Sequence, residues 1–486
     1  MGIIQKQATL STIFIFGGIL FGTVSRLLMP FILTKNQVGT LALLDSVSSV
    51  LSTFFCLGFT QITLNSFSNF KNEKNGHSGY FAFALFVTII GIVLGVSTFI
   101  FFKDFLVGTE VSNQTIQAFS ILLIPLIIFQ IFAKNMDIYL RMLYSSVIGT
   151  FWESFILKIL LLLVLIVFWS GVIDFEHLIY LYVVAFSLPG LALLITAVSK
   201  TGKLILPKKE NFTASARKKI YGFGLYGILA TASSMIIISV DQLMINRMLG
   251  TDALGIYAIM FFAGILVSVP SRGVKRISVA VLSDSWKNND LKNIQSVYEK
   301  SSLTNLILGG FLFTIGWACI ELALYYLPDY KEGLYVFFFI GLAQLVEMMT
   351  GVNSEIIATS RVYRANTYFN IGLAVLAIIL NYFLISLYGI VGAAIASFLA
   401  VIIINSLRCL YLIKKYKLQP FNRKFAVVLF ILAGLILAVN FMNFNLPTHF
   451  EIVARLIFWA TIYWVIILKF KFSEDINGWF NKIIKR

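Results

Sequence analysis

The stretch MIIISVDQLMINRMLGTDALGIYAIM, residues 235–260, contains the pattern around which the chain is organised. An apolar segment carrying Asp241 and Arg247 ends in a short polar turn, and Gly255 and Tyr257 follow in a second apolar segment. Two apolar segments joined by a few polar residues are typical of adjacent helices that span a membrane. We therefore predict the end of one transmembrane helix and the start of the next.

This pattern occurs twice. Residues 33–42 (LTKNQVGTLA) align with residues 249–258 (LGTDALGIYA) at an offset of 216 residues, which matches Gly39 to Gly255. Outside this stretch, the same offset matches Arg26 to Gln242, the residue after Asp241. At the same offset, FKN at 70–72 aligns with WKN at 286–288. Two matches at one offset favour an internal duplication. The alternative is that Gly and Asn recur by chance in short turns.

Composition indicates a polytopic membrane protein. Of the 486 residues, 59% are hydrophobic and 12% are charged, whereas soluble proteins are about a quarter charged. The net charge of +16 is carried by short loops, which argues against a nucleic-acid partner. The three cysteines, Cys56, Cys319 and Cys409, lack metal-ligand spacing, and we interpret them as packing residues.

The apolar runs predict an all-α fold with about 14 transmembrane helices, arranged as two pseudo-symmetric six-helix lobes plus two C-terminal helices. The predicted spans are 8–33, 39–64, 80–102, 112–139, 148–170, 177–199, 220–248, 252–280, 301–326, 332–359, 365–387, 389–413, 424–443 and 450–470. The predicted parts are an N-lobe at 1–199, a cytoplasmic linker at 200–219, a C-lobe at 220–415, helices 13 and 14 within 416–472, and a basic amphipathic tail at 473–486.

Loop charges predict the orientation, because Lys and Arg are retained on the cytoplasmic side. With the N-terminus inside, almost all of the 38 Lys and Arg residues lie at inward ends. The exceptions at outward ends or within helices are Lys35, Lys103, Arg247, Lys331, Arg26, Lys158 and Arg455. Both termini are therefore predicted to be cytoplasmic. The tail, with Ile476, Trp479, Phe480 and Ile483 at helical spacing, fits an interfacial helix or a frayed basic end.

Two charges lie deep in matching apolar helices. Arg26 lies in the first predicted helix and Asp241 in the seventh, at nearly the same depth. A charge at such a position costs roughly 2.5–3.5 kcal/mol on insertion scales, so each needs a partner or a function. We predict that the two pair across a central cavity and close its outer side; a static interhelical ion pair is the alternative.

Three cations on the eighth predicted helix form a second candidate site. Arg272, Lys275 and Arg276 have i, i+3, i+4 spacing, which predicts a shared face near the inner end. Arg binds phosphate bidentately and Lys acts as a point charge, so these residues are candidates for binding an anionic head group. Pro270 just before them is a candidate hinge. The alternative is ordinary snorkelling at a helix end.

Further charged residues lie inside other helices. On the fourth, Lys134, Asp137 and Arg141 share a face, and the simplest interpretation is that Lys134 and Asp137 neutralise each other. The tenth and ninth predicted helices carry buried polar and acidic residues that we interpret as ligands of a coupling cation, namely Glu347, Asn353, Glu355 and Glu321; Glu347 and Glu355 are also candidate gating groups. Their spacing leaves Na⁺ and H⁺ both open, and no other cofactor or metal is expected.

Signals of catalysis are absent from the sequence. The three histidines, His77, His177 and His449, fall in separate loops without a carboxylate or cysteine at ligand spacing. No Gly-rich phosphate loop occurs, and outward loops of roughly five to fifteen residues are too short for a catalytic domain. We therefore expect a protein that moves a substrate and is not an enzyme.

Three segments carry a family resemblance: MGIIQKQATLSTIFIFGGILFG at the N-terminus, D-x5-R-x-L-G-T-x-A-L-G-I-Y from Asp241, and YGIVGAAIASFLA from Tyr388. The chain resembles the polysaccharide-biosynthesis flippases, of the superfamily that also holds multidrug antiporters and lipid II flippases. The resemblance implies two six-helix lobes around a central cavity, alternating access, and a polyprenyl-pyrophosphate-linked oligosaccharide moved from the inner to the outer leaflet of the bacterial cytoplasmic (inner) membrane. It also implies a pathway such as O-antigen assembly, with a polysaccharide polymerase and glycosyltransferases as partners.

The resemblance implies a head-group role for Arg26 and Arg272, which match cavity arginines of lipid II flippases in helix and general position. The chain departs from lipid II flippases because Arg26 is the only strong candidate cation in its first two helices. It departs from multidrug antiporters because fourteen helices are predicted, not twelve, and the first helix has no buried acid. A lipid II flippase, a cation-coupled multidrug antiporter and a non-transporting scaffold of a glycan-assembly complex, acting through loop residues such as Lys208 and Lys209, remain the alternatives.

Overall fold

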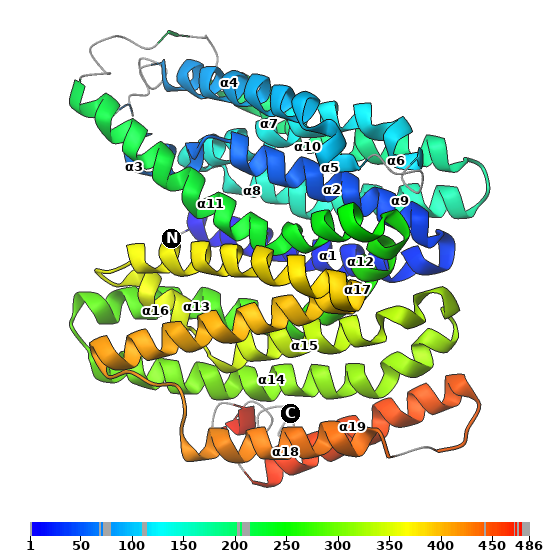
Figure 1. Ribbon diagram of the computed structural model, residues 1–486. Coiled ribbons are helices and arrows are strands. Elements are labelled where there is room, and N and C mark those ends of the chain that lie inside the picture. The colour runs from blue at the N-terminus through cyan, green and yellow to red at the C-terminus, as the bar shows by residue number, and fades with distance from the viewer. Residues whose placement is uncertain are drawn as a thin grey trace. The chain divides into compact units, whose positions relative to one another are not determined.

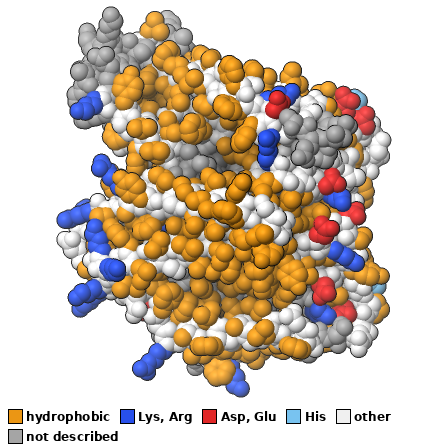
Figure 2. Space-filling model, viewed as in Figure 1, with side chains coloured by type: hydrophobic (Ala, Val, Ile, Leu, Met, Phe, Trp, Pro, Cys, Tyr) orange, Lys and Arg blue, Asp and Glu red, His pale blue; other side chains and the backbone are white. Residues whose placement is uncertain are grey.

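The structure, a computed structural model, describes residues 2–67, 70, 79–108, 114–201, 205–206, 214–441, 444–470, 472–473 and 476–478. These residues contain helices and no strands, which confirms the all-α prediction. Eleven helices among them are long and apolar enough to cross a membrane. On the face shown in Figure 2, hydrophobic side chains cover the middle, and Lys, Arg, Asp and Glu side chains gather toward the left and right edges. The count of fourteen spans remains a prediction.

The chain packs as two compact units, Met1–Gly255 (unit 1) and Ile256–Arg486 (unit 2). The elements of unit 1 (Figure 1) are α1 (Gly2–Ile32), α2 (Lys35–Phe55), α3 (Phe59–Ser66), α4 (Tyr80–Phe101), α5 (Lys103–Val107), α6 (Gln114–Phe119), η4 (Ser120–Leu122), α7 (Leu123–Met142), α8 (Ser146–Gly149), the π-helix η5 (Thr150–Ile156), α9 (Leu157–Trp169), α10 (Phe175–Thr201), α11 (Ala214–Leu249) and the start of α12 (Thr251–Ile265). The elements of unit 2 are the rest of α12, η7 (Leu266–Ser268), α13 (Val269–Lys287), α14 (Leu291–Tyr325), η8 (Pro328–Gly333), α15 (Leu334–Met349), α16 (Asn353–Thr359), α17 (Arg364–Tyr416), α18 (Arg423–Val439) and α19 (Thr448–Lys469).

The compact units and the predicted lobes divide the chain by different criteria. Units follow packing, and α11 belongs to unit 1 because it packs on α2 and α3. Lobes follow the sequence repeat, with a boundary in the 200–219 linker. Most of that linker lies outside the described residues, as do Lys208 and Lys209, so the lobe boundaries remain a prediction.

The repeated turn makes a reciprocal contact inside unit 1. A Cβ on Gly39 would overlap the carbonyl oxygen of Thr251, and a Cβ on Gly255 would overlap the carbonyl oxygen of Lys35. Lys35 corresponds to Thr251, and Gly39 to Gly255, at the repeat offset, so each copy presents its glycine to the start of the other copy. Such close approach requires residues without a side chain. This reciprocity supports the internal duplication.

Several predicted spans are interrupted. The second breaks into α2 and α3, and the tenth breaks into α15 and α16 at Gly351, whose φ of 66° favours glycine. The predicted turn between the eleventh and twelfth spans lies inside α17, where Gly389 has non-helical angles. A 3₁₀ turn, η7, directly precedes α13, and Pro270 lies in the first turn of α13, where proline is well tolerated; its hinge role remains a prediction.

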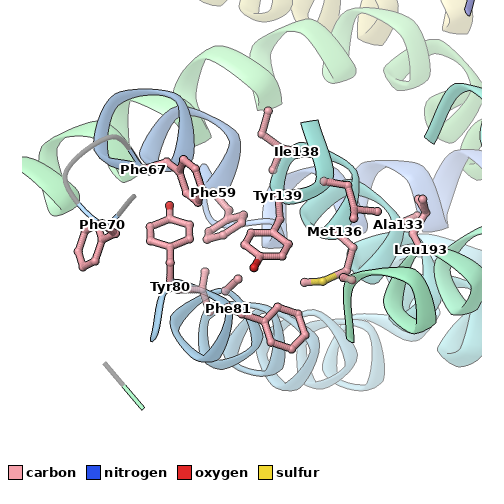
Figure 3. Packing of buried hydrophobic residues seen from close by; sticks show 14 residues of the cluster. Phe59, Phe67, Phe70, Tyr80, Phe81, Ala133, Met136, Ile138, Tyr139 and Leu193 are labelled. Atoms are coloured by element: carbon pink, nitrogen blue, oxygen red, sulfur yellow. The ribbon is translucent and has the colours of Figure 1, made fainter. Parts of the chain in front are cut away.

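An aromatic cluster holds part of unit 1 together (Figure 3). Phe59, Phe67, Tyr80 and Tyr139 come from α3, α4 and α7 and from the residue that follows α3, and the rings of Tyr80 and Tyr139 stack with centroids 6.4 Å apart. The Tyr80 hydroxyl donates a hydrogen bond to Thr63 Oγ1 at 3.0 Å, so this buried phenol has a partner. The cluster fixes α7, which carries three of the charged residues considered below.

In unit 2, α18 and α19 pack against α14. The Tyr463 hydroxyl donates a hydrogen bond to the carbonyl of Ile307 at 2.7 Å. Phe472 and Ile476 are buried in the same hydrophobic core. Trp479, Phe480 and Ile483 lie outside the described residues, so the interfacial tail remains a prediction.

Candidate functional site

Arg26 on α1 forms an ion pair with Asp45 on α2. Arg26 Nη2 lies 3.4 Å from Asp45 Oδ2, and the two side chains are 28% and 32% exposed. Sequence reasoning missed Asp45, although an acid in an apolar helix is the same signal that singled out Arg26. Asp241 is buried on α11, where its neighbour Gln242 accepts a hydrogen bond from Ser46. The pairing of Arg26 with Asp241 remains a prediction.

Lys134 on α7 is held by neutral acceptors. Its ammonium donates to Ser52 Oγ at 2.7 Å, to Thr53 Oγ1 at 2.5 Å and to the carbonyl of Ser49 at 3.4 Å. These acceptors lie in the last two turns of α2, where the helix dipole is negative. Three donors thus meet three acceptors, which compensates for burying the charge.

Asp137 on α7 pairs with Arg141 one turn later, with Arg141 Nη2 2.6 Å from Asp137 Oδ2. The interpretation that Lys134 neutralises Asp137 is therefore wrong. The reason is geometric: Lys134 extends across to α2, whereas Arg141 lies at i+4 on the same face of α7.

A π-helical turn adds an acid to this group. Glu153 lies in η5 and interacts electrostatically with Asp137, Lys134 and Arg141. Lys158 on α9 interacts in the same way with Asp45 and Arg26. π-helices are rare and occur frequently at functional sites. We name the set the N-cluster: Arg26, Asp45, Lys134, Asp137, Arg141, Glu153 and Lys158.

A second cluster lies in unit 2 around Lys275 on α13. Lys275 Nζ is 2.8 Å from Glu347 Oε1 on α15 and 4.0 Å from Glu355 Oε1 on α16. The break at Gly351 lies between these two acids in the chain. The structure therefore joins a predicted head-group cation to the two predicted coupling acids.

Residues of α17 and α16 complete the second cluster. Asn405 Nδ2 donates to Glu347 Oε2 at 2.8 Å, and Asn353 Nδ2 donates to Asn405 Oδ1 at 2.9 Å. Arg408, 4% exposed, donates to Asn370 Oδ1 at 2.6 Å and interacts electrostatically with both acids. We name Lys275, Glu347, Asn353, Glu355, Asn405 and Arg408 the C-cluster. Sequence reasoning missed Asn405 and Arg408, because their contacts with the acids depend on how α17 packs against α15 and α16.

The remaining predicted residues lie apart from this network. Arg272 and Arg276 are exposed on α13, and within the described part of the chain neither forms an ion pair. Among the described residues, Lys275 is therefore the member of this trio that pairs with acids, and the joint head-group role of the three cations remains a prediction. Glu321 is exposed, so its interpretation as a buried acid is wrong.

The two clusters bring opposite charges together. Among the described residues, no group of three or more His, Cys, Asp or Glu side chains is placed to bind a metal ion. Both clusters combine cations with acids inside apolar helices, where a charge requires a partner. Such groups can bind an anion in exchange for an internal acid, or take up a proton when a cation moves away.

The fold matches that of known membrane transporters. The chain is similar to the lipid II flippase MurJ in an inward closed conformation, with a TM-score of 0.71 and 15% identity over 95% of this chain and 99% of that chain. It is also similar to a multidrug resistance MATE family transporter in an inward-facing conformation, with a TM-score of 0.57 and 12% identity over 85% of this chain and 98% of that chain. A MOP superfamily transporter from Pyrococcus furiosus matches with a TM-score of 0.53 and 12% identity over 89% of this chain and 96% of that chain. The chain therefore has the fold of the MOP-superfamily transporters.

The family follows from the sequence match. The model of the polysaccharide biosynthesis protein family matches residues 4–282, more than half of the chain, and the chain belongs to this family. This confirms the family resemblance of the sequence motifs. No curated protein matches the sequence. The structural neighbours named above are transporters and a flippase and not enzymes.

Proposed function

We propose that this protein is a flippase that moves a polyprenyl-pyrophosphate-linked oligosaccharide from the inner to the outer leaflet of a bacterial cytoplasmic membrane, by alternating access, for surface polysaccharide assembly. The observation that carries the proposal is the N-cluster. It places four cations against three acids in apolar helices, and a pyrophosphate needs cations at membrane depth. Family membership supplies the glycan context.

Arg26 is the head-group residue that we propose in unit 1. Its ion pair with Asp45 is monodentate at 3.4 Å, and both side chains are about a third exposed. A diphosphate offers oxygens for bidentate contacts with a guanidinium, so it competes well with such a pair. Arg272, exposed on α13, is the corresponding candidate in unit 2.

The test is transbilayer movement of a labelled polyprenyl-pyrophosphate oligosaccharide in proteoliposomes. We expect Arg26→Ala and Arg272→Ala to reduce movement by at least about tenfold, the equivalent of one charge-assisted hydrogen bond. Arg26→Lys should keep part of the rate, because lysine keeps the positive charge but lacks the planar guanidinium that contacts two oxygens at once. Lys331→Ala, at an exposed residue of η8, is the matched control and should behave as wild type.

Other outcomes would favour the alternatives. Wild-type rates in both arginine variants would withdraw the head-group site. Movement of lipid II in place of the oligosaccharide lipid would indicate a lipid II flippase. Cation-dependent efflux of a dye would indicate a multidrug antiporter. No movement of any substrate by folded protein, with loss of function on substituting Lys208 and Lys209, would indicate a scaffold for a polymerase or glycosyltransferase.

A further inference from the structure

The two acids that contact Lys275 are supported unequally. Glu347 receives Lys275 on one oxygen and Asn405 on the other, each at 2.8 Å. Glu355 has Lys275 at 4.0 Å and its own backbone amide, while its Oε2 is buried without a hydrogen-bond partner. If Lys275 moved away, Glu347 would keep Asn405, but Glu355 would lose its nearest cation.

The charges of the C-cluster balance. The charged groups that face Glu355 are Lys275 from α13, Glu347 from α15 and Arg408 from α17. Two cations and two carboxylates leave the group neutral. Lys275 Nζ already contacts both carboxylates, where a metal cation would bind, so an added Na⁺ would be unbalanced. When Lys275 leaves, a proton needs a single carboxylate oxygen, such as the unpartnered Glu355 Oε2, whereas a metal ion needs several ligands.

An anion bound next to Lys275 could replace the two acids as its counter-ion. Arg272 and Arg276 lie on the same helix, exposed and without ion pairs among the described residues. An anion held by these arginines would attract the Lys275 ammonium, which ends a flexible four-carbon stem. The same flexibility lets Lys275 return to the acids when the anion leaves.

We propose that the C-cluster couples anion binding to proton uptake by counter-ion exchange. A diphosphate that binds at Arg272 and Arg276 draws Lys275 away from the acids. Glu355 then takes one proton from the buffered solution, forming an O–H bond at its carboxylate, because a buried carboxylate that has lost its nearest cation is costly and neutralises. Release of the anion returns Lys275 and expels the proton. This inference rests on the proposed function and names H⁺ as the ion that accompanies the head group.

The test counts protons during binding of farnesyl diphosphate to the purified full-length protein in lipid nanodiscs. Calorimetry at pH 7.5, repeated in buffers of different ionisation enthalpy, gives the number of protons exchanged per diphosphate bound. The diphosphate itself also titrates, so the informative quantity is the difference between wild type and Glu355→Gln. We expect wild type to take up close to one proton more than Glu355→Gln.

Further variants separate the steps. Glu332→Gln, at an exposed acid of η8, should match wild type in affinity and proton count. Lys275→Gln should bind about tenfold more weakly and lose the extra proton, because Glu355 is then neutral beforehand. Equal proton counts in wild type and Glu355→Gln, with binding intact, would overturn the exchange mechanism alone. No binding of the diphosphate by wild type would overturn both the proposed function and this inference.

Discussion

Glu451 and Arg455 on α19 form a buried ion pair in which each residue depends on the other. Arg455 Nη2 and Nε donate to Glu451 Oε1 at 2.7 and 3.0 Å, and the side chains are 11% and 7% exposed. Removing one partner leaves an uncompensated charge, so we expect Arg455→Met to lower the free energy of unfolding by about 3–5 kcal/mol. Unfolding of the purified protein in mixed detergent micelles measures this.

The double variant is the control for that prediction. Glu451→Gln combined with Arg455→Met removes both charges and should recover most of the lost stability. A double variant as unstable as Arg455→Met would show that packing of the arginine stem, and not the charge, is what stabilises α19.

The sequence could identify charged residues but not their partners. Arg26, Lys275, Glu347 and Glu355 were predicted because a charge in an apolar helix is costly wherever it lies. Their contacts depend on packing between segments far apart in the chain, and Lys275 meets Glu347 across 72 residues. The Arg26 pair with Asp45 is closer in sequence, at 19 residues, but it required knowing that α1 and α2 present these faces to each other.

At the scale of elements, the contact between α2 and α12 depends on two glycines. A Cβ at Gly39 or at Gly255 would overlap a carbonyl oxygen of the other helix. Because the contact is reciprocal, we expect Gly39→Ala and Gly255→Ala to destabilise the protein by similar amounts, about 1–3 kcal/mol each, as overpacking does. The measurement is the unfolding transition in mixed micelles.

A glycine in open space serves as the control for this pair. A Cβ at Gly222 on α11 would meet nothing within 4 Å, so Gly222→Ala should be neutral or stabilise by up to about 1 kcal/mol through helix propensity. Destabilisation confined to one of Gly39→Ala and Gly255→Ala would contradict the reciprocal contact.

Helix breaks explain where the element prediction failed. Apolar runs predicted continuous second and tenth spans, but the structure breaks them after Phe55 and near Gly351. Hydropathy cannot show these breaks because the residues around them, such as Leu57 and Val352, are themselves apolar. The reverse holds at Gly389, where glycines around an apolar run did predict the interruption within α17.

At the scale of the whole molecule, orientation is the property that loop charge predicts and that helix packing alone does not. The distribution of Lys and Arg predicts cytoplasmic termini, and each turn then has an assigned side. The orientation can be tested by introducing single cysteines into a variant that lacks Cys56, Cys319 and Cys409. Each variant is then treated with a membrane-impermeant maleimide on intact cells, which labels only cysteines on the outer side. All four chosen positions are exposed, two in each unit: Val172, Tyr144, Glu332 and Lys292.

The expected pattern is specific to one topology. Cysteines at Val172 and Glu332 should react in intact cells, whereas those at Tyr144 and Lys292 should react only after permeabilisation, which also controls for reactivity. A reversed pattern would place both termini outside and move the Lys-rich ends to the outer face. A pattern reversed in one unit only would mean that the predicted number of spans between Val172 and Glu332 is wrong by an odd number. The charge alternation supports the orientation and the fourteen-helix count together. This result would contradict the count while leaving the orientation of one unit as predicted.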